Sequence, residues 1–233
     1  MTFEEIPEVP ASIKGYMAHV IKEDEGITLT KSSNDPGGLT YYGMTYKTFH
    51  KIERRWGEST SAEGFEAAAL SGSELLLQRI FAAYYLTFWQ KLRLTDLAAV
   101  NPQFAKAAFS AVINLGIQEG TILLQTAILN TKAGPHDEKF QGFIDGIVGE
   151  RTVACFVHCS LANKGPDVMR EFRRLWLKKY ADIVQENCET WDAYIATLEN
   201  QIEQPELKLV KLKPRYKRWK YLEGWLERAQ RWV

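Results

Sequence analysis

Hydrophobic residues recur at helical spacing along most of the chain. Apolar side chains at positions 13, 17, 20 and 21 predict a first helix that begins near Ser12 and ends at Gly26. The same periodicity predicts further helices over residues 46–56, 73–89, 104–129, 151–163, 166–199 and 216–232. The pattern therefore predicts a mainly α protein whose C-terminal region is also helical.

Residues 27–45 follow a different pattern. Positions 28–30 and 39–44 have β-like composition, and the sequence Asn-Asp-Pro-Gly-Gly at 34–38 lies between them as a dense turn signal. We expect a small β-hairpin in this segment, inserted between the first two helices.

The chain is long enough for one large domain or two small ones. It has 233 residues, of which 45% are hydrophobic and 25% charged. A short polar break at Asn101-Pro102 separates two helical blocks. We therefore predict one region over residues 1–100 and a second, helical region over residues 101–233.

The charges of the whole chain cancel. Lys and Arg number 29, and Asp and Glu also number 29, so no bulk charge attracts the chain to nucleic acid or to a membrane. From residue 201 onward, however, nine basic residues face four acidic ones. The basic run over residues 208–220 is either a solvated face or a transient contact with anionic wall polymer, lipid headgroups or nucleic acid.

The three cysteines do not suggest a disulfide framework. An odd count of Cys residues (155, 159 and 188) is typical of reduced thiols, and too few neighbouring ligands are present for a structural zinc ion. The first residues lack a basic segment followed by an apolar run, and no stretch reaches 18 uninterrupted apolar residues. We expect synthesis in the cytoplasm without a signal peptide, and no metal or other cofactor.

Two carboxylates near the predicted hairpin are candidates for acid–base chemistry. Glu25 ends the first predicted helix, where the helix dipole and the adjacent Glu23 and Asp24 favour a raised pKa. Asp35 follows at the mouth of the glycine-rich turn. Two carboxylates across a cleft are the minimal equipment of a glycoside hydrolase. The alternative is a solvated glutamate at a helix end and an ordinary turn.

Other residues of this segment suit binding of a sugar polymer. Gly37 and Gly38 let a bulky substrate approach the backbone, and the Thr40 hydroxyl is able to hold a water molecule. Aromatic faces on which sugar rings pack are available from Tyr41, Tyr42 and Trp89.

These motifs resemble a known enzyme family. Glu25-Gly26, followed by Asp-Pro-Gly-Gly-Leu-Thr-Tyr-Tyr-Gly-Met-Thr at 35–45, is similar to the signature of glycoside hydrolase family 108. Its members are N-acetylmuramidases with a lysozyme-like fold, found in phage endolysins and bacterial cell-wall enzymes. The resemblance implies that Glu25 is the catalytic acid and that Asp35 and Thr40 assist it. The sequence departs from the family at Ile27, where a second glycine is usual, and at Tyr42, where asparagine is frequent.

The second half resembles the predicted peptidoglycan-binding domain that follows this catalytic module. The resemblance rests on Phe109, on Asn-Leu-Gly at 114–116, on Leu-Gln at 124–125 and on the segment 145–152. It implies wall contacts through Asn114, Asp145, Gly146, Gly149 and Thr152. The alternative is that this motif orders a loop between two helices.

The function implied by these resemblances is hydrolysis of the β-1,4 bond between N-acetylmuramic acid and N-acetylglucosamine in peptidoglycan. An inverting mechanism is favoured, because a hairpin Asp and a helix-end Glu leave room for a water molecule. We expect action in the periplasm or cell wall, reached through a holin or a secretion apparatus, as an endolysin or secreted lytic effector. Two rival hypotheses are a catalytically weak wall-binding module and a basic-tailed nucleic-acid or membrane-binding protein.

Overall fold

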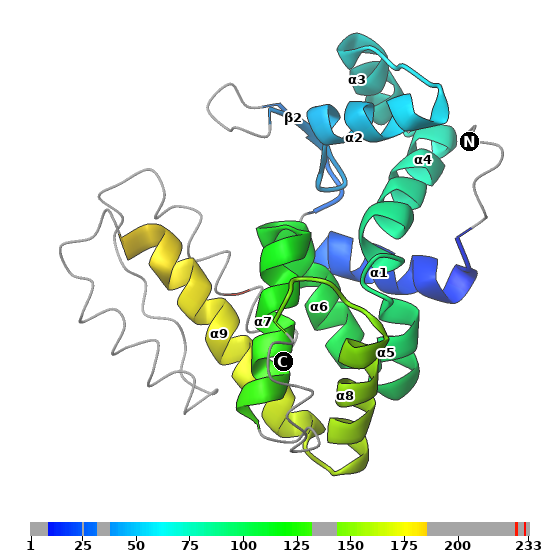
Figure 1. Ribbon diagram of the computed structural model, residues 1–233. Coiled ribbons are helices and arrows are strands. Elements are labelled where there is room, and N and C mark those ends of the chain that lie inside the picture. The colour runs from blue at the N-terminus through cyan, green and yellow to red at the C-terminus, as the bar shows by residue number, and fades with distance from the viewer. Residues whose placement is uncertain are drawn as a thin grey trace. The chain divides into compact units, whose positions relative to one another are not determined.

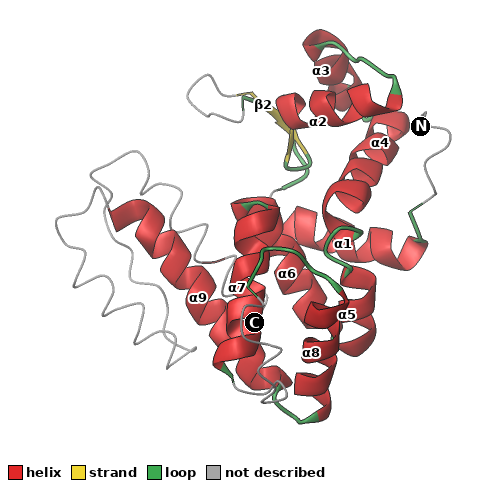
Figure 2. Cartoon of the chain, in the orientation of Figure 1, coloured by secondary structure: helices red, strands yellow, loops and turns green. Residues whose placement is uncertain are grey.

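The computed structural model describes residues 9–24, 26–31, 38–131 and 144–185, together with residues 227 and 231. In this part the chain is mainly helical and carries one small antiparallel sheet, which confirms the predicted fold class (Figures 1 and 2). The predicted helix 216–232 and the end of the predicted helix 166–199 lie outside the described residues, apart from positions 227 and 231.

The described elements follow one another in a simple order. The first are α1 (Ala11–Asp24), β1 (Thr30–Lys31), β2 (Leu39–Tyr41), β3 (Met44–Thr45), α2 (Tyr46–Glu53) and η2 (Arg54–Trp56). They continue with α3 (Ala62–Leu70), α4 (Glu74–Tyr84), η3 (Tyr85–Trp89), α5 (Leu94–Val100), α6 (Pro102–Leu115), α7 (Ile117–Asn130), α8 (Glu150–Leu161) and α9 (Gly165–Gln185).

The chain divides into two compact units within α5. The first unit runs to Thr95 and the second begins at Asp96, whereas the sequence pattern placed the change at residues 100 and 101. The different roles expected for the two regions stay predictions.

The first unit forms its core around α4. Helices α1, α2 and α3 all pack against α4, and buried aromatic side chains from α2 and α3 meet where Phe49 and Phe65 lie 5.2 Å apart. Helix α4 then continues into η3, a π-helical turn. The three-stranded sheet contacts α2 and α3 within this unit.

The second unit is a helical bundle. Helices α6 and α9 both pack along α7, and Figure 1 shows α7 and α9 side by side. Two polar contacts join α7 to α9. Lys179 Nζ lies 2.7 Å from Glu119 Oε2, and Asn130 Nδ2 donates a hydrogen bond to Glu171 Oε1 at 2.7 Å. Phe104 of α6 stacks on Phe156 of α8, with ring centroids 4.1 Å apart.

The predicted single helix over residues 104–129 is wrong, because the chain breaks it at Gly116. This glycine has φ of +88°, which a residue with a side chain rarely adopts, so α6 ends and α7 starts there. A Cβ atom at Gly120 would lie 2.5 Å from Val112 Cγ1, so the close approach of α6 and α7 requires glycine.

None of the described helices is long and apolar enough to span a membrane.

Candidate active site

The middle strand of the sheet presents Thr40 on a polar face. The register pairs Thr40 with Thr30 of β1 and with Thr45 of β3. Directly opposed residues of antiparallel strands project from the same face of a sheet. Three threonines therefore form a row across this face, and Thr40 at its centre is half-buried.

The opposite face of the sheet is apolar and turned to the core. Tyr41 pairs with Met44, and both side chains are buried. Lys31 at the edge is joined to Glu66 of α3 by a 2.8 Å ion pair. The alternation of residues along β2 thus leaves the threonine row as the polar side of the hairpin.

One member of the row also fixes the start of α2. The side-chain oxygen of Thr45 accepts a hydrogen bond from the Thr48 backbone N–H at 3.2 Å and caps the helix. Thr45 Oγ1 also donates to Thr48 Oγ1 at 2.9 Å. The Thr45 hydroxyl is thereby engaged by the protein.

The turn between β2 and β3 is held in an uncommon backbone conformation. Tyr42 has φ of +50°, and its carbonyl accepts a hydrogen bond from Tyr84 Oη at 3.0 Å. Its ring meets Tyr41 edge-on at 4.8 Å and lies 6.3 Å from Phe81. Burial, and secondarily the neighbouring Tyr42, raise the pKa of Tyr41. Tyr41 is thus mainly a core residue, whereas Tyr42 is half-exposed.

The predicted acid Glu25 lies outside the described residues, as do Asp35 and Gly37. The positions beside them are described. Gly26 has φ of +76°, and its N–H donates to the Ile21 carbonyl at 3.0 Å, which closes the end of α1. Gly38 also has a positive φ, of +62°, as expected for a glycine-dependent turn.

Trp89 does not offer the open ring face predicted for it as a sugar-binding residue. Its side chain is only 1% exposed. Tyr16 of α1 stacks on it with ring centroids 6.2 Å apart and planes 5° apart, and its Nε1–H donates to Thr95 Oγ1 at 3.0 Å. Trp89 is therefore a packing residue in this structure, because protein atoms already cover its faces.

The motif at 145–152 is fastened to α7 by Gln125, a fully buried residue. Gln125 Nε2 donates to Asp145 Oδ1 at 2.8 Å and to the Ile147 carbonyl at 3.0 Å, and lies 3.3 Å from Thr152 Oγ1. Gln125 Oε1 accepts from the N–H groups of Asp145, at 3.1 Å, and Gly146, at 2.9 Å. Both ends of the amide are thus satisfied by the loop.

These hydrogen bonds, and the burial of part of the motif, argue against several of the residues expected to contact the wall. Gly146 and Thr152 are buried, so neither residue is exposed for contact with a polymer. Asn114 directs its Nδ2 to the Ser110 carbonyl at 2.8 Å, one turn back in α6. Gly149 is the residue before α8 and is half-buried, while Asp145 is exposed. These contacts favour the alternative interpretation, in which the motif orders a loop.

No group of three or more His, Cys, Asp or Glu residues arranged to hold a metal ion occurs in the part of the chain that the structure describes. Cys155 and Cys159 are both buried in α8. Burial, and then the proximity of Cys159, raise the pKa of Cys155 to about 11.

In the described part of the chain, the helices and the small sheet with Thr40 at its centre form a mainly α, lysozyme-like fold. The model of the family Glycosyl hydrolase 108 matches residues 18–116, which run from the middle of α1 through the hairpin to the end of α6. This segment is thus similar to Glycosyl hydrolase 108, and the match indicates that the protein is a glycoside hydrolase that acts on peptidoglycan.

One solved structure supports the fold. The "Structure of Brucella abortus SagA" is similar with a TM-score of 0.50 and 18% sequence identity, over 84% of this chain and 92% of that chain. At this identity the likeness shows the fold alone. No curated protein sequence matches the chain.

Proposed function

We propose that the protein is an N-acetylmuramidase that cleaves the β-1,4 bond between N-acetylmuramic acid and N-acetylglucosamine. The observation that carries the proposal is the match of residues 18–116 to Glycosyl hydrolase 108, together with the Glu25, Asp35 and Thr40 set within that match. The hairpin supports the proposal, because it places Thr40 on a polar sheet face rather than in the core.

In this mechanism Glu25 is the general acid. Its carboxyl group gives a proton to the glycosidic oxygen as the bond to the muramic acid anomeric carbon breaks. Developing positive charge on the sugar ring is stabilised by the carboxylate of Asp35.

Thr40 has the role of positioning the attacking water. A hydroxyl accepts and donates hydrogen bonds at once, so it is able to hold a water between itself and the Asp35 carboxylate. That water attacks the anomeric carbon on the face opposite the leaving group and passes its proton to the Asp35 carboxylate, which gives inversion, the outcome that we propose.

Substitution of Glu25 tests the proposed acid. Glu25→Gln is expected to lower the release of reducing sugar from purified peptidoglycan by at least about 100-fold, because the proton donor is lost. The matched control is Glu23→Gln, which removes the same charge from an exposed carboxylate of α1 two residues earlier. Mass analysis of wild-type products should find fragments that end in reducing N-acetylmuramic acid.

Two other results would contradict the proposal. Equal losses in the Glu23 and Glu25 variants would point to charge rather than proton donation. Binding of wild type to peptidoglycan without any release of reducing ends would favour the wall-binding module.

The substrate lies outside the cytoplasmic membrane, so the enzyme needs a route across that membrane. We propose passage through a holin or a secretion apparatus, with an endolysin role as the favoured setting. Co-expression with and without a holin, followed by culture turbidity, tests that route. Lysis that is equally fast without the holin would contradict it.

A further inference from the structure

Four cationic side chains share one exposed face of α2 and η2, which we call the basic face. The first three are separated by four and three residues, which places them on the same side of the helix, and the fourth follows directly in the 3-10 turn η2. All four are exposed, while the opposite side of the same elements, with Phe49, Ile52 and Trp56, is buried. The basic face consists of Lys47, Lys51, Arg54 and Arg55.

The one carboxylate within this stretch is withdrawn from the surface. Glu53 is 0% exposed. Its Oε1 accepts from the Thr60 N–H at 2.6 Å and its Oε2 from the Thr60 hydroxyl at 2.8 Å, and His50 Nδ1 lies 3.2 Å from Oε1. Glu53 therefore fastens the loop at Thr60 to α2, and its oxygens contact Thr60 and His50 rather than a cation of the basic face.

Acidic residues of the surrounding elements are engaged elsewhere. Glu58 pairs with Arg79 of α4 at 3.4 Å, and Glu66 pairs with Lys31 of β1 at 2.8 Å. In the described part of the chain, none of the four side chains of the basic face forms an ion pair. Residues 1–95 contain more acidic than basic residues, and these four cations are concentrated on α2 and η2 of this otherwise acidic unit.

We propose that the basic face binds the carboxylates of peptidoglycan stem peptides. The proposal rests on the proposed function, because it assigns the anionic partner to the polymer that the enzyme hydrolyses. Stem peptides carry free carboxylates at regular intervals along a glycan strand, which gives charge complementarity to a row of separated cations. Contacts of this kind hold the enzyme on the wall between cleavage events.

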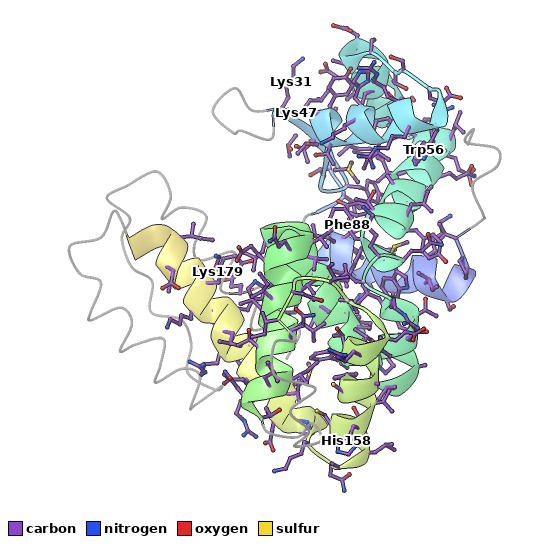
Figure 3. All side chains as sticks on the ribbon, viewed as in Figure 1. Lys31, Lys47, Trp56, Phe88, His158 and Lys179 are labelled. Carbon is purple, nitrogen blue, oxygen red and sulfur yellow. The ribbon has the colours of Figure 1, made fainter. Side chains whose placement is uncertain are left out.

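The composition of the face favours this polymer over a lipid bilayer. Basic helices that bind membranes also carry large apolar side chains that enter the headgroup boundary. Within α2 and η2, which the structure describes in full, no large hydrophobic side chain is exposed. Figure 3 shows Lys47 at the start of α2 and Trp56 beyond its other end. The cations of the basic face, at positions 47 to 55, are therefore spread from the start of α2 into η2.

Binding to insoluble peptidoglycan tests the inference. A Glu25→Gln background keeps the polymer intact during sedimentation. In that background, Lys47→Gln/Lys51→Gln/Arg54→Gln/Arg55→Gln is expected to weaken binding about tenfold at low salt, because each exposed ion pair contributes modestly. The control removes four exposed charges elsewhere, at Lys22, Lys91, Arg151 and Lys178, and should change binding less than about twofold.

Two further comparisons identify the partner group. At about 0.5 M NaCl the difference between the two variants should vanish, because exposed charges are then screened. Peptidoglycan whose carboxylates have been converted to amides should bind the background protein about tenfold less tightly. Lys47→Gln/Lys51→Gln, which keeps the two arginines at the helix end, should lose about threefold and serves as a milder variant for folding.

Equal binding by the basic-face variant and its control would overturn the inference, and so would undiminished binding of amidated peptidoglycan. A loss confined to phosphatidylglycerol vesicles or to double-stranded DNA would assign the face to that other partner and overturn it as well. A failure of the proposed function would be seen in a different assay, in which wild-type protein would release no reducing ends from peptidoglycan. The sedimentation comparison does not depend on that reaction.

Discussion

Of the three proposed catalytic residues, Thr40 is the one that lies within the described part of the chain. Thr40→Val keeps the shape and the β preference of the side chain but removes its hydroxyl. We expect kcat to fall about 100-fold with KM changed less than about threefold, because the lost contact positions water and not the sugar. Steady-state release of reducing ends measures both constants.

The same row of threonines supplies the control for Thr40. Thr30→Val removes a hydroxyl from the adjoining strand of the same face and should leave kcat within about threefold of wild type. An equal fall in both variants would show that the polarity of the face, rather than the Thr40 hydroxyl, supports the reaction.

The sequence identified Thr40 but not the row to which it belongs. The motif placed Thr40 next to the glycine-rich turn, and a strand there was predicted from composition. Its pairing with Thr30 and Thr45 depends on the register, which shifts every side chain to the other face when it changes by one residue. Likewise, the burial of Trp89 depends on Tyr16 of a distant helix, and no local pattern encodes that contact.

The loop that precedes α8 depends on α7 through Gln125. In Gln125→Glu an acceptor oxygen replaces the donor that faces Asp145 Oδ1 and the Ile147 carbonyl. We expect the free energy of unfolding to fall by about 3 kcal/mol, because buried polar groups lose their partners and two carboxylates meet. Denaturant unfolding measures the change.

An exposed glutamine of α6 gives a matched control for this substitution. Gln103→Glu makes the same chemical change at the solvent-facing start of its helix and should alter stability by less than about 0.5 kcal/mol. If Gln125→Glu were equally mild, the amide would not be the group that orders the loop.

The helices show which parts of a fold periodicity can predict. Amphipathic spacing found α1, α2, α4, α8 and the start of α9, since each has buried residues that recur three or four positions apart. It joined α6 to α7 because both are apolar on most sides, and only the positive φ of Gly116 separates them. It missed α3, a nine-residue helix whose start depends on a hydrogen bond from the Gly64 N–H to the Ser61 side chain at 3.1 Å.

Carboxylates of both units are stabilised in their charged form. Hydrogen bonds from Gln125 and from the Ile147 N–H hold the pKa of Asp145 below its ordinary value, and Arg174 does the same for Glu171. In the first unit, the N–H of Glu63 and the Ser61 side chain lower the pKa of Glu63. A lowered pKa in the folded state means that the unfolded chain binds more protons as the solution is acidified.

The whole molecule should therefore lose stability on acidification. The stabilisation from these groups is fully present above their unfolded pKa values and is lost as the pH falls from about 5 through their lower folded values. Thermal unfolding of wild type between pH 7 and pH 3 should show a steadily falling melting temperature. Asp145→Asn/Glu171→Gln, which cannot take up these protons, should start lower at pH 7 and decline less steeply. If the melting temperatures of both proteins declined in parallel, other carboxylates would control the acid response. The ion pair of Glu171 with Arg174 and the hydrogen bonds of Gln125 to Asp145 would then contribute only to local order.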